Sequence, residues 1–307
     1  MSWILLSLLS AMLLGLYDIA KKSAVEENAV APVLLLNVIT GAICCIPLVI
    51  ASRLASHGGG LLWLRESIWF VQPLATYEHV LVSLKSLLVG LSWMLSFVAL
   101  RSLPISIASP IRATSPVWTV LIAVLWMGER PEPTQWFGMS VVFVAFIAFT
   151  RVGKSEGIHF HRDRGVGLLV AATLLGSCSA MYDKYLLQSV GLSPATLQAW
   201  FAIYLVPVMM PWFVWWYLSE RRSHPFSWRW SIPLIALFLL AADFCYFTAI
   251  SYPEALISII SPLRRASIII AFLAGILLLG EKNWKSKAIC IGLLLVGVCL
   301  MGWGRSG

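Results

Sequence analysis

Arginines inside hydrophobic segments are the residues of this sequence best suited to binding chemistry. Arg112 lies in the apolar segment 104–127, and Arg264 and Arg265 lie in the segment 255–280. An arginine near the centre of a membrane helix costs roughly 2.5–3.5 kcal/mol, so we expect all three to face a protein interior or a water-filled cavity. A planar guanidinium group binds carboxylate and phosphate through paired hydrogen bonds. The arginines therefore predict a buried site for a small anionic or zwitterionic metabolite.

The two arginine segments are copies of one motif. Residues 105–115 read ISIASPIRATS and residues 257–267 read ISIISPLRRAS, with seven of the eleven positions identical. The register continues without a gap to a Gly-Glu pair at 128–129 and at 280–281. Internal repeats of this kind are a common building principle of secondary transporters.

Each copy places a serine on the face of the helix that carries its arginine. At 100° per residue, Ser109 shares a face with Arg112, and Ser261 shares a face with Arg264. The proline that follows each serine removes a backbone donor and opens a carbonyl group for coordination. These prolines can equally serve only to kink and pack the helices. We predict that the serines and arginines contact the substrate.

Asp243 is the acidic residue that lies deepest in a hydrophobic segment of the second half. It precedes the turn at residue 253 by ten residues, and Arg264 follows that turn by eleven, so the two reach a similar depth on adjacent antiparallel helices. Asp243 either neutralises Arg264 or exchanges protons during transport. The equivalent position in the first half is Trp93, which we expect to line an asymmetric site.

Several polar residues lie near the ends of hydrophobic segments. Tyr17-Asp18 in the first half matches Tyr182-Asp183 in the second. We expect the two tyrosines to be repeat-related partners that line the cavity, although both could instead belong to an interfacial aromatic belt. The two aspartates allow an interfacial interpretation as well. We expect Lys85, in the segment 80–102, to extend its long side chain to the interface.

The composition of the chain indicates a membrane protein. Of its 307 residues 60% are apolar and only 12% are charged, whereas soluble proteins carry roughly 25% charged residues. The net charge is +8, but the basic residues occupy short connections and form no long patch, so nucleic-acid binding is not expected. The cysteines form no ligand cluster, and no P-loop, nucleophile elbow or metalloprotease motif occurs, so we expect neither a metal nor a cofactor.

The apolar residues fall into ten segments of about membrane-spanning length. The segments are 3–20, 30–52, 80–102, 104–127, 133–150, 166–188, 194–218, 231–252, 255–280 and 285–303. They divide into two five-helix repeats, 1–152 and 165–304. Because each repeat holds an odd number of segments, the second repeat starts on the opposite side of the membrane, and the repeats are inverted. The predicted fold is an all-α integral membrane protein.

The sequence does not decide on which side of the membrane the termini lie. About thirteen of the 22 Lys and Arg residues lie in the connections after segments 1, 3, 5, 7 and 9, and about four lie on the other face. The positive-inside rule then places both termini outside the cell.

With ten segments in two halves, the chain resembles the drug/metabolite transporter superfamily, in particular its EamA-type branch. Each half ends in a Ser-Pro helix, a Gly-Glu turn and a final hydrophobic helix, most clearly over 109–129 and 261–281. The resemblance implies a ten-helix carrier with a central cavity, alternating access and termini in the cytoplasm, which conflicts with the charge count. The sequence departs from the common pattern at Ile268, where the second repeat often has proline.

The resulting hypothesis is a multi-pass inner-membrane secondary transporter without enzymatic activity. Its partners would be a small-molecule substrate, the lipid bilayer, and a proton or exchange gradient as the driving force. Two alternatives remain: an integral-membrane lipid-modifying enzyme, which would need acid-base or metal residues at one interface, and a non-transporting scaffold or sensor. The substrate, the direction and the oligomeric state do not follow from the sequence.

Overall fold

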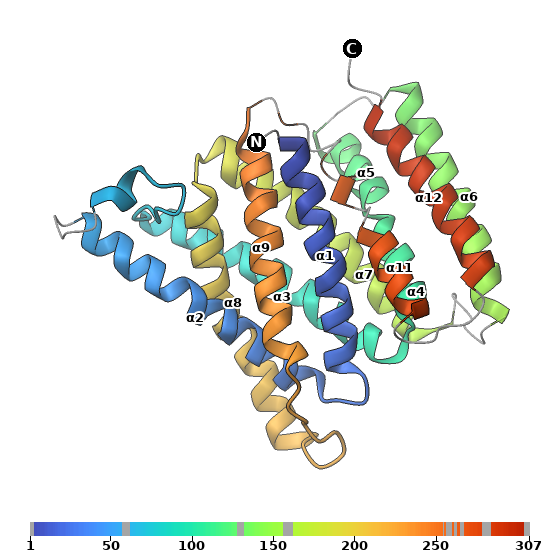
Figure 1. Cartoon of the computed structure of the whole chain (residues 1–307), viewed down its shortest axis with the longest axis horizontal. Helices are drawn as coiled ribbons and strands as arrows, with labels where there is room; N and C mark the ends of the chain where they lie inside the picture. Colours follow the sequence, from blue (N-terminus) through green and yellow to red (C-terminus); the bar gives the residue numbers. More distant parts are fainter. Residues whose placement is uncertain are drawn as a thin grey trace.

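The computed structural model shows an α-helical protein (Figure 1). It describes residues 3–56, 62–127, 132–155, 162–253, 255, 260, 263–264, 267–277 and 284–303. The helices are α1 (Trp3–Val25), α2 (Val30–Ser56), η1 (Leu62–Glu66), α3 (Thr76–Ser102), α4 (Ile105–Ala113), α5 (Ser115–Met127), α6 (Pro133–Ser155), α7 (Arg164–Lys184), η2 (Tyr185–Ser189), α8 (Pro194–Ser219), α9 (Ser231–Ser251), α11 (Ser267–Leu277) and α12 (Trp284–Trp303). These ranges contain no strand, in agreement with the all-α prediction.

Within the described residues, six helical segments are long and apolar enough to cross a membrane. They are α1, α2, α3, α7 with its π-helical continuation η2, α8 and α9. Helices α6 and α12 contain shorter apolar stretches, at 136–145 and 288–300. The protein is therefore a multi-pass membrane protein, while the number of ten crossings stays a prediction.

Local sequence signals explain where helices in the second half begin and end. The Asp163 side chain accepts a hydrogen bond from the Val166 N–H at 3.0 Å and caps the start of α7. Ser193 caps α8 in the same way. After η2 the chain turns at Gly191, whose φ of +82° is a conformation that glycine adopts without steric cost.

The segment 104–127 departs from its prediction as one continuous helix. It is interrupted at Thr114, so that α4 ends at Ala113 and α5 begins at Ser115. Pro116 lacks the N–H that would bond the carbonyl group of Arg112, and this explains the break. The consequence is that Arg112 lies in the last turn of a short helix, beside backbone that has left the regular helical pattern.

The most extensive packing joins helices of the first half to helices of the second. The principal pairs are α1 with α9, α3 with α7, α2 with α8, and α6 with α12. Figure 1 shows α6 and α12 side by side at the edge of the molecule, and α1, α3, α7, α8 and α9 around its centre. The start of α1 and the end of α12 lie at the same end of the molecule.

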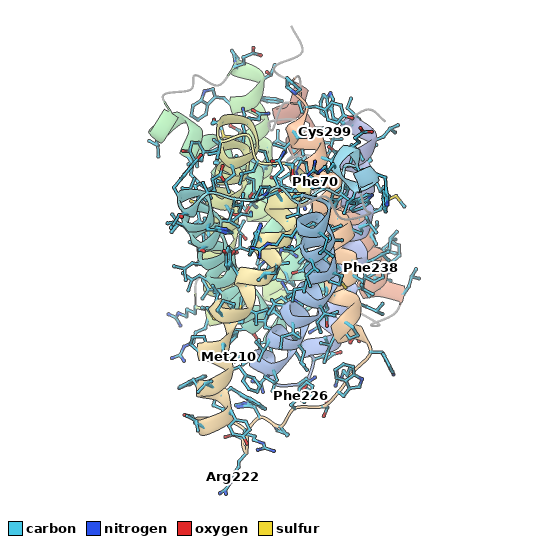
Figure 2. All side chains as sticks on the ribbon, turned by 90° about the vertical axis from the view of Figure 1, so that its left-hand side faces the viewer. Phe70, Met210, Arg222, Phe226, Phe238 and Cys299 are labelled. Atoms are coloured by element: carbon cyan, nitrogen blue, oxygen red, sulfur yellow. The ribbon has the colours of Figure 1, made fainter. Side chains whose placement is uncertain are left out.

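Large apolar side chains cover the outer surface of the helices. Ile43, Leu125 and Ile289 are 62%, 83% and 75% exposed. Such exposure would be costly in water and is expected where lipid chains replace the solvent. Figure 2 shows Arg222 at one tip of the molecule, in the polar connection after α8, whereas Met210 and Phe238 lie along its sides.

Candidate functional site

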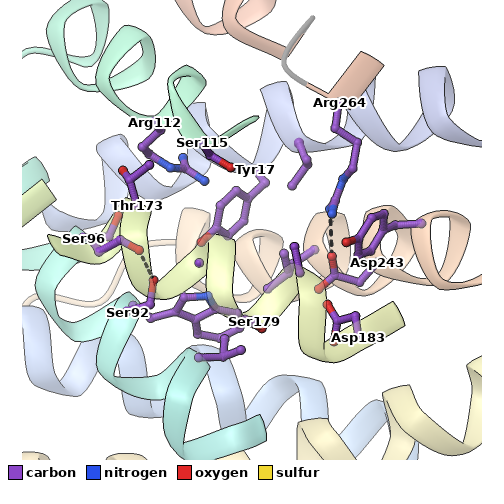
Figure 3. Close-up of a pocket in the computed structure, with 18 of the residues that line it drawn as sticks. Tyr17, Ser92, Ser96, Arg112, Ser115, Thr173, Ser179, Asp183, Asp243 and Arg264 are labelled. Atoms are coloured by element: carbon purple, nitrogen blue, oxygen red, sulfur yellow. Dashed lines mark hydrogen bonds and ion pairs between the residues drawn. The ribbon is translucent and has the colours of Figure 1, made fainter. Parts of the chain in front are cut away.

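A polar cavity of about 170 Å³ lies at the centre of the helices and is called the central cavity below. Helices α1, α3, α7 and α9 form most of its wall, to which Arg112, Ser115, Phe201 and Arg264 also contribute (Figure 3). The cavity lies where the two halves of the chain meet, because α1 and α3 come from the first half and α7 and α9 from the second.

Arg112 forms an ion pair across the first half of the chain. Its Nη1 atom donates to Asp18 Oδ1 in α1. Asp18 is buried, so the interfacial interpretation of this residue is wrong: α1 continues to Val25 and carries Asp18 well inside the helix. The partner neutralises Arg112, which still contributes to the wall of the central cavity.

Lys85 forms a second ion pair, with Asp183, and joins the two halves of the chain. The expectation that Lys85 extends to the membrane interface is wrong, because its side chain is 2% exposed and lies beside the rings of Phe201 and Phe247. Asp183 is also buried rather than interfacial. Helix α3 begins at Thr76, earlier than the segment 80–102 suggested, so Lys85 lies more than two turns inside it.

The pair predicted between Asp243 and Arg264 is present. Arg264 Nη2 donates to Asp243 Oδ1 at 3.0 Å, and Figure 3 shows the two side chains pointing toward one another with Asp183 next to them. The guanidinium group also lies 3.7 Å from the ring centroid of Tyr246. Its Nε atom is buried and has no hydrogen-bond partner within the part of the chain that the structure describes.

Lys21 is a buried cation of the cavity wall that no carboxylate pairs with among the described residues. Its side chain is 1% exposed, and its Nζ donates to Ser96 Oγ at 2.8 Å. The ammonium group lies 4.2 Å from the ring centroid of Phe97 and 5.5 Å from that of Tyr17. The charge count assigned Lys21 to a connection, and this assignment is wrong because α1 includes it.

The basic groups of the cavity wall differ in how they are neutralised. Arg112, Lys85 and Arg264 each have a carboxylate partner. Lys21 is the basic group of the wall that has no carboxylate partner among the described residues.

Hydroxyl and aromatic groups complete the cavity wall. Ser92 and Ser96 come from α3, and Thr173 and Ser179 come from α7. Trp93, predicted to line the site, is part of the cavity wall, and its ring centroid lies 6.1 Å from that of Phe201. The wall thus offers cations at fixed positions, neutral hydrogen-bonding groups and a flat aromatic surface.

The structure brings together some of the predicted site residues and not others. Tyr17 lines the cavity, whereas Tyr182 donates to the Leu81 carbonyl group at 3.2 Å, stacks on Tyr185 and is not part of the cavity wall. Arg265 and Ser261 lie outside the described residues. Ser109 lies in α4, but its side chain also lies outside them.

Residues of α3 and α7 that line the cavity were missed in the sequence. On α3 they are Lys85, Ser92 and Ser96, spaced seven and four residues apart, which places them on one helix face. On α7, Thr173 and Asp183 are ten residues apart and lie about 80° from one another around the helix axis, on the same side of the helix. A search for polar stripes at helical spacing inside hydrophobic segments would have found both sets.

The fold and the cavity define the class of the protein: a helical, multi-pass membrane protein with a charged internal site. Residues 1–151 match the model of the EamA-like transporter family. This match confirms the resemblance to EamA-type drug/metabolite transporters that the repeated Ser-Pro and Gly-Glu motifs indicate.

Two further comparisons extend the likeness. Over 126 residues the chain is 30% identical to the human protein Solute carrier family 35 member E4; this match covers 41% of the chain and spans only 35% of the length of that relative. A solved crystal structure of a protein that is 16% identical aligns with a TM-score of 0.58, covering 97% of this chain and 95% of the other. The structural match shows the fold alone.

Proposed function

We propose that this protein is a secondary transporter of the inner membrane that moves a small anionic or zwitterionic metabolite through the central cavity. The EamA-like first half supports transport as the activity. The single observation that carries the substrate class is Lys21, which is buried in the cavity wall and lacks a carboxylate partner among the described residues. A bound carboxylate or phosphate would compensate this charge in surroundings of low dielectric constant.

Arg264 adds a second reason to expect an anion. Its buried Nε–H has no acceptor within the described residues, and an unsatisfied buried donor is costly. An anionic oxygen in the cavity would give this donor a partner. Arg112 would then position the substrate from the first half, together with Ser109 of that half and Ser261 of the second.

Alternating access between two inverted five-helix repeats, 1–152 and 165–304, is the proposed mechanism. The helix packing supports this mechanism. If α1 of the first repeat corresponds to α7 of the second, and α3 to α9, then the contact of α1 with α9 corresponds to the contact of α7 with α3. Both contacts are present. The same correspondence maps the α2–α8 and α6–α12 pairs onto themselves. A proton or exchange gradient would supply the driving force.

Replacing Lys21 tests the proposed substrate class. Binding of carboxylates, phosphate esters, amino acids and organic cations to the purified protein is measured by thermal shift and calorimetry. We expect anions or zwitterions to bind, and Lys21→Met to weaken that binding at least about tenfold through the loss of a charge-assisted hydrogen bond.

Lys22→Met is the matched control. Lys22 is the next residue and is also buried, but it donates to the carbonyl groups of Leu100 and Leu103 at the end of α3 and is not part of the cavity wall. This variant should lose some stability and keep its affinity for the substrate. Preference for organic cations, or equal affinity of Lys21→Met and the wild-type protein, would contradict the proposal.

A further inference from the structure

The residues that form the Arg112–Asp18 ion pair have counterparts in the second half of the chain. Arg264 corresponds to Arg112 in the ungapped Ser-Pro repeat, and Asp183 corresponds to Asp18 in the repeated Tyr-Asp dipeptide. The two aspartates also lie at about the same distance from the end of the first helical stretch of their halves, α1 and α7 with η2. The symmetry of the repeats therefore predicts an ion pair between Arg264 and Asp183.

The structure shows a different pairing in the second half. Arg264 Nη2 donates to Asp243 Oδ1 at 3.0 Å, and Lys85 Nζ of α3 donates to Asp183 Oδ1. All four side chains line the central cavity, and Figure 3 shows Asp183 next to the Asp243–Arg264 pair. Each carboxylate also interacts electrostatically with the basic group of the other pair. These four residues, called the charge cluster below, are therefore neighbours that could pair in either of two ways.

Lys85 and Asp243 have no charged counterpart in the other half of the chain. When α9 is aligned with α3, Asp243 corresponds to Trp93 and Lys85 corresponds to Ile235. These two additional charges separate the arginine and the aspartate that symmetry relates, because one binds the guanidinium group and the other binds the carboxylate. The two halves thus differ in the partners of these residues, and the residues themselves are repeated.

Inverted repeats give this difference a consequence for alternating access. If each repeat adopts the conformation of the other, the cavity opens to the opposite side of the membrane. The second half then takes the pairing that the first half shows, which joins Arg264 to Asp183. Lys85 loses its partner in this step and is left next to Asp243. No member of the charge cluster remains unpaired, and this matters because an uncompensated buried charge is costly.

We propose that Arg264 exchanges Asp243 for Asp183, and Lys85 exchanges Asp183 for Asp243, when the central cavity changes the side to which it opens. The inference rests on the proposed function, specifically on alternating access between inverted repeats. Asp183 and Asp243 are then positioning residues, which hold one guanidinium group at two alternative places. Because both pairings compensate all four charges, the empty protein can reorient without a bound substrate.

Two double variants each restrict the charge cluster to one pairing. Lys85→Met with Asp183→Asn leaves Asp243 as the carboxylate of the cluster that Arg264 can bind. Lys85→Met with Asp243→Asn leaves Asp183 instead. Both variants keep one basic group and one carboxylate in the cluster, so they are matched in charge and each is the control for the other. We expect them to hold the cavity open to opposite sides.

The reactivity of a single cysteine in the cavity wall reports the side to which the cavity opens. Ser179→Cys is introduced into a background without the six native cysteines, because Ser179 lines the cavity and is not part of the charge cluster. A small membrane-impermeant methanethiosulfonate reagent is applied to right-side-out and to inverted membrane vesicles, with no substrate added. The rate of modification from each side is compared between the wild-type cluster and the two double variants.

Each double variant should react at least about tenfold faster from one side, and the preferred side should differ between them, because each shifts the population toward one state. The wild-type cluster should react from both sides. A preference for the same side in both variants would overturn the exchange. The single variants Asp183→Asn and Asp243→Asn repeat the comparison with Lys85 in place, and we expect the same two preferences at smaller size.

The outcomes separate this exchange from the proposed function. A common preferred side, with the wild-type cluster still modified from both sides, leaves alternating access standing and removes only the exchange. Modification of every variant from one side alone, at Ser179→Cys and also at Ser92→Cys of α3, would contradict alternating access and the exchange with it. Ser92 is a suitable second probe because it lines the same cavity from another helix.

Discussion

At the scale of single residues, the described basic groups of the central cavity have carboxylate partners, with the exception of Lys21. Three cations around the central cavity have carboxylate partners, and the ammonium group of Lys21 has a serine hydroxyl and two aromatic rings instead. Aromatic faces attract a cation, but they do not neutralise it. The paired charges therefore stabilise the fold, while Lys21 remains the residue best placed to attract a ligand.

The Asp243–Arg264 pair gives a prediction about stability. Asp243→Asn leaves the guanidinium group of Arg264 without its counter-charge, and we expect the free energy of unfolding to fall by about 3 kcal/mol. Arg264→Gln in the same protein should restore part of this loss, because the unpaired cation is then removed. Thermal unfolding of the two single variants and the double variant in detergent measures the effect.

Asp163→Asn serves as the control for that series. Asparagine caps a helix as well as aspartate does, so the start of α7 should be unaffected. If Asp243→Asn and Arg264→Gln both leave the unfolding temperature at the wild-type value, the ion pair contributes nothing to the fold.

At the scale of elements, glycines set how closely some helices approach. A Cβ atom on Gly297 of α12 would lie 2.9 Å from the carbonyl oxygen of Gly138 and 2.8 Å from the Val142 side chain, both in α6. Backbone atoms cannot move aside as a flexible side chain can. The contact between α6 and α12 therefore depends on the absence of a side chain at this position.

Gly297→Ala should separate α6 from α12 and destabilise the protein by about 1–3 kcal/mol. Gly292→Ala, on the same helix, has no atom within 4 Å of the added Cβ and should be neutral or slightly stabilising, since alanine favours a helix. Chemical denaturation of both variants provides the comparison. Equal stabilities of the two would show that α12 does not pack against α6 in this register.

At the scale of the whole molecule, contacts between loops define two ends. Asn28, which follows α1, donates to the Ser227 carbonyl group at 2.9 Å, in the connection that follows α8. The N–H group of Gln72, which precedes α3, donates to Thr196 Oγ1 at 2.8 Å, in the first turn of α8. The connection after α1 and the connection before α8 thus lie at opposite ends. This arrangement is what inverted repeats require of the corresponding helices α1 and α7.

Site-directed labelling tests the inverted arrangement. Single cysteines replace Glu26, which follows α1, and Ser189, the last residue of η2, in a background without the six native cysteines; both positions are exposed. A membrane-impermeant maleimide applied to sealed vesicles should label the two positions from opposite sides. Labelling of both positions from the same side would refute the inverted repeats.

Local properties of the sequence were sufficient to predict the membrane class, the helical fold and most helix positions. Hydrophobic length is a property of one segment, and the repeated Ser-Pro-x-Arg motif is a property of two. The same local information predicted that Arg112 and Arg264 face the interior, because the cost of burying a charge in lipid does not depend on the rest of the fold.

Only the tertiary structure decided which charges meet. Lys85 and Asp183 are 98 residues apart in the sequence, and Arg112 and Asp18 are 94 apart. Their pairing depends on the crossing of α3 with α7 and of α4 with α1, and neither crossing is encoded in any one segment. Among the described residues Lys21 has no carboxylate partner for the same reason, because helix packing places Ser96 of α3 next to its ammonium group instead.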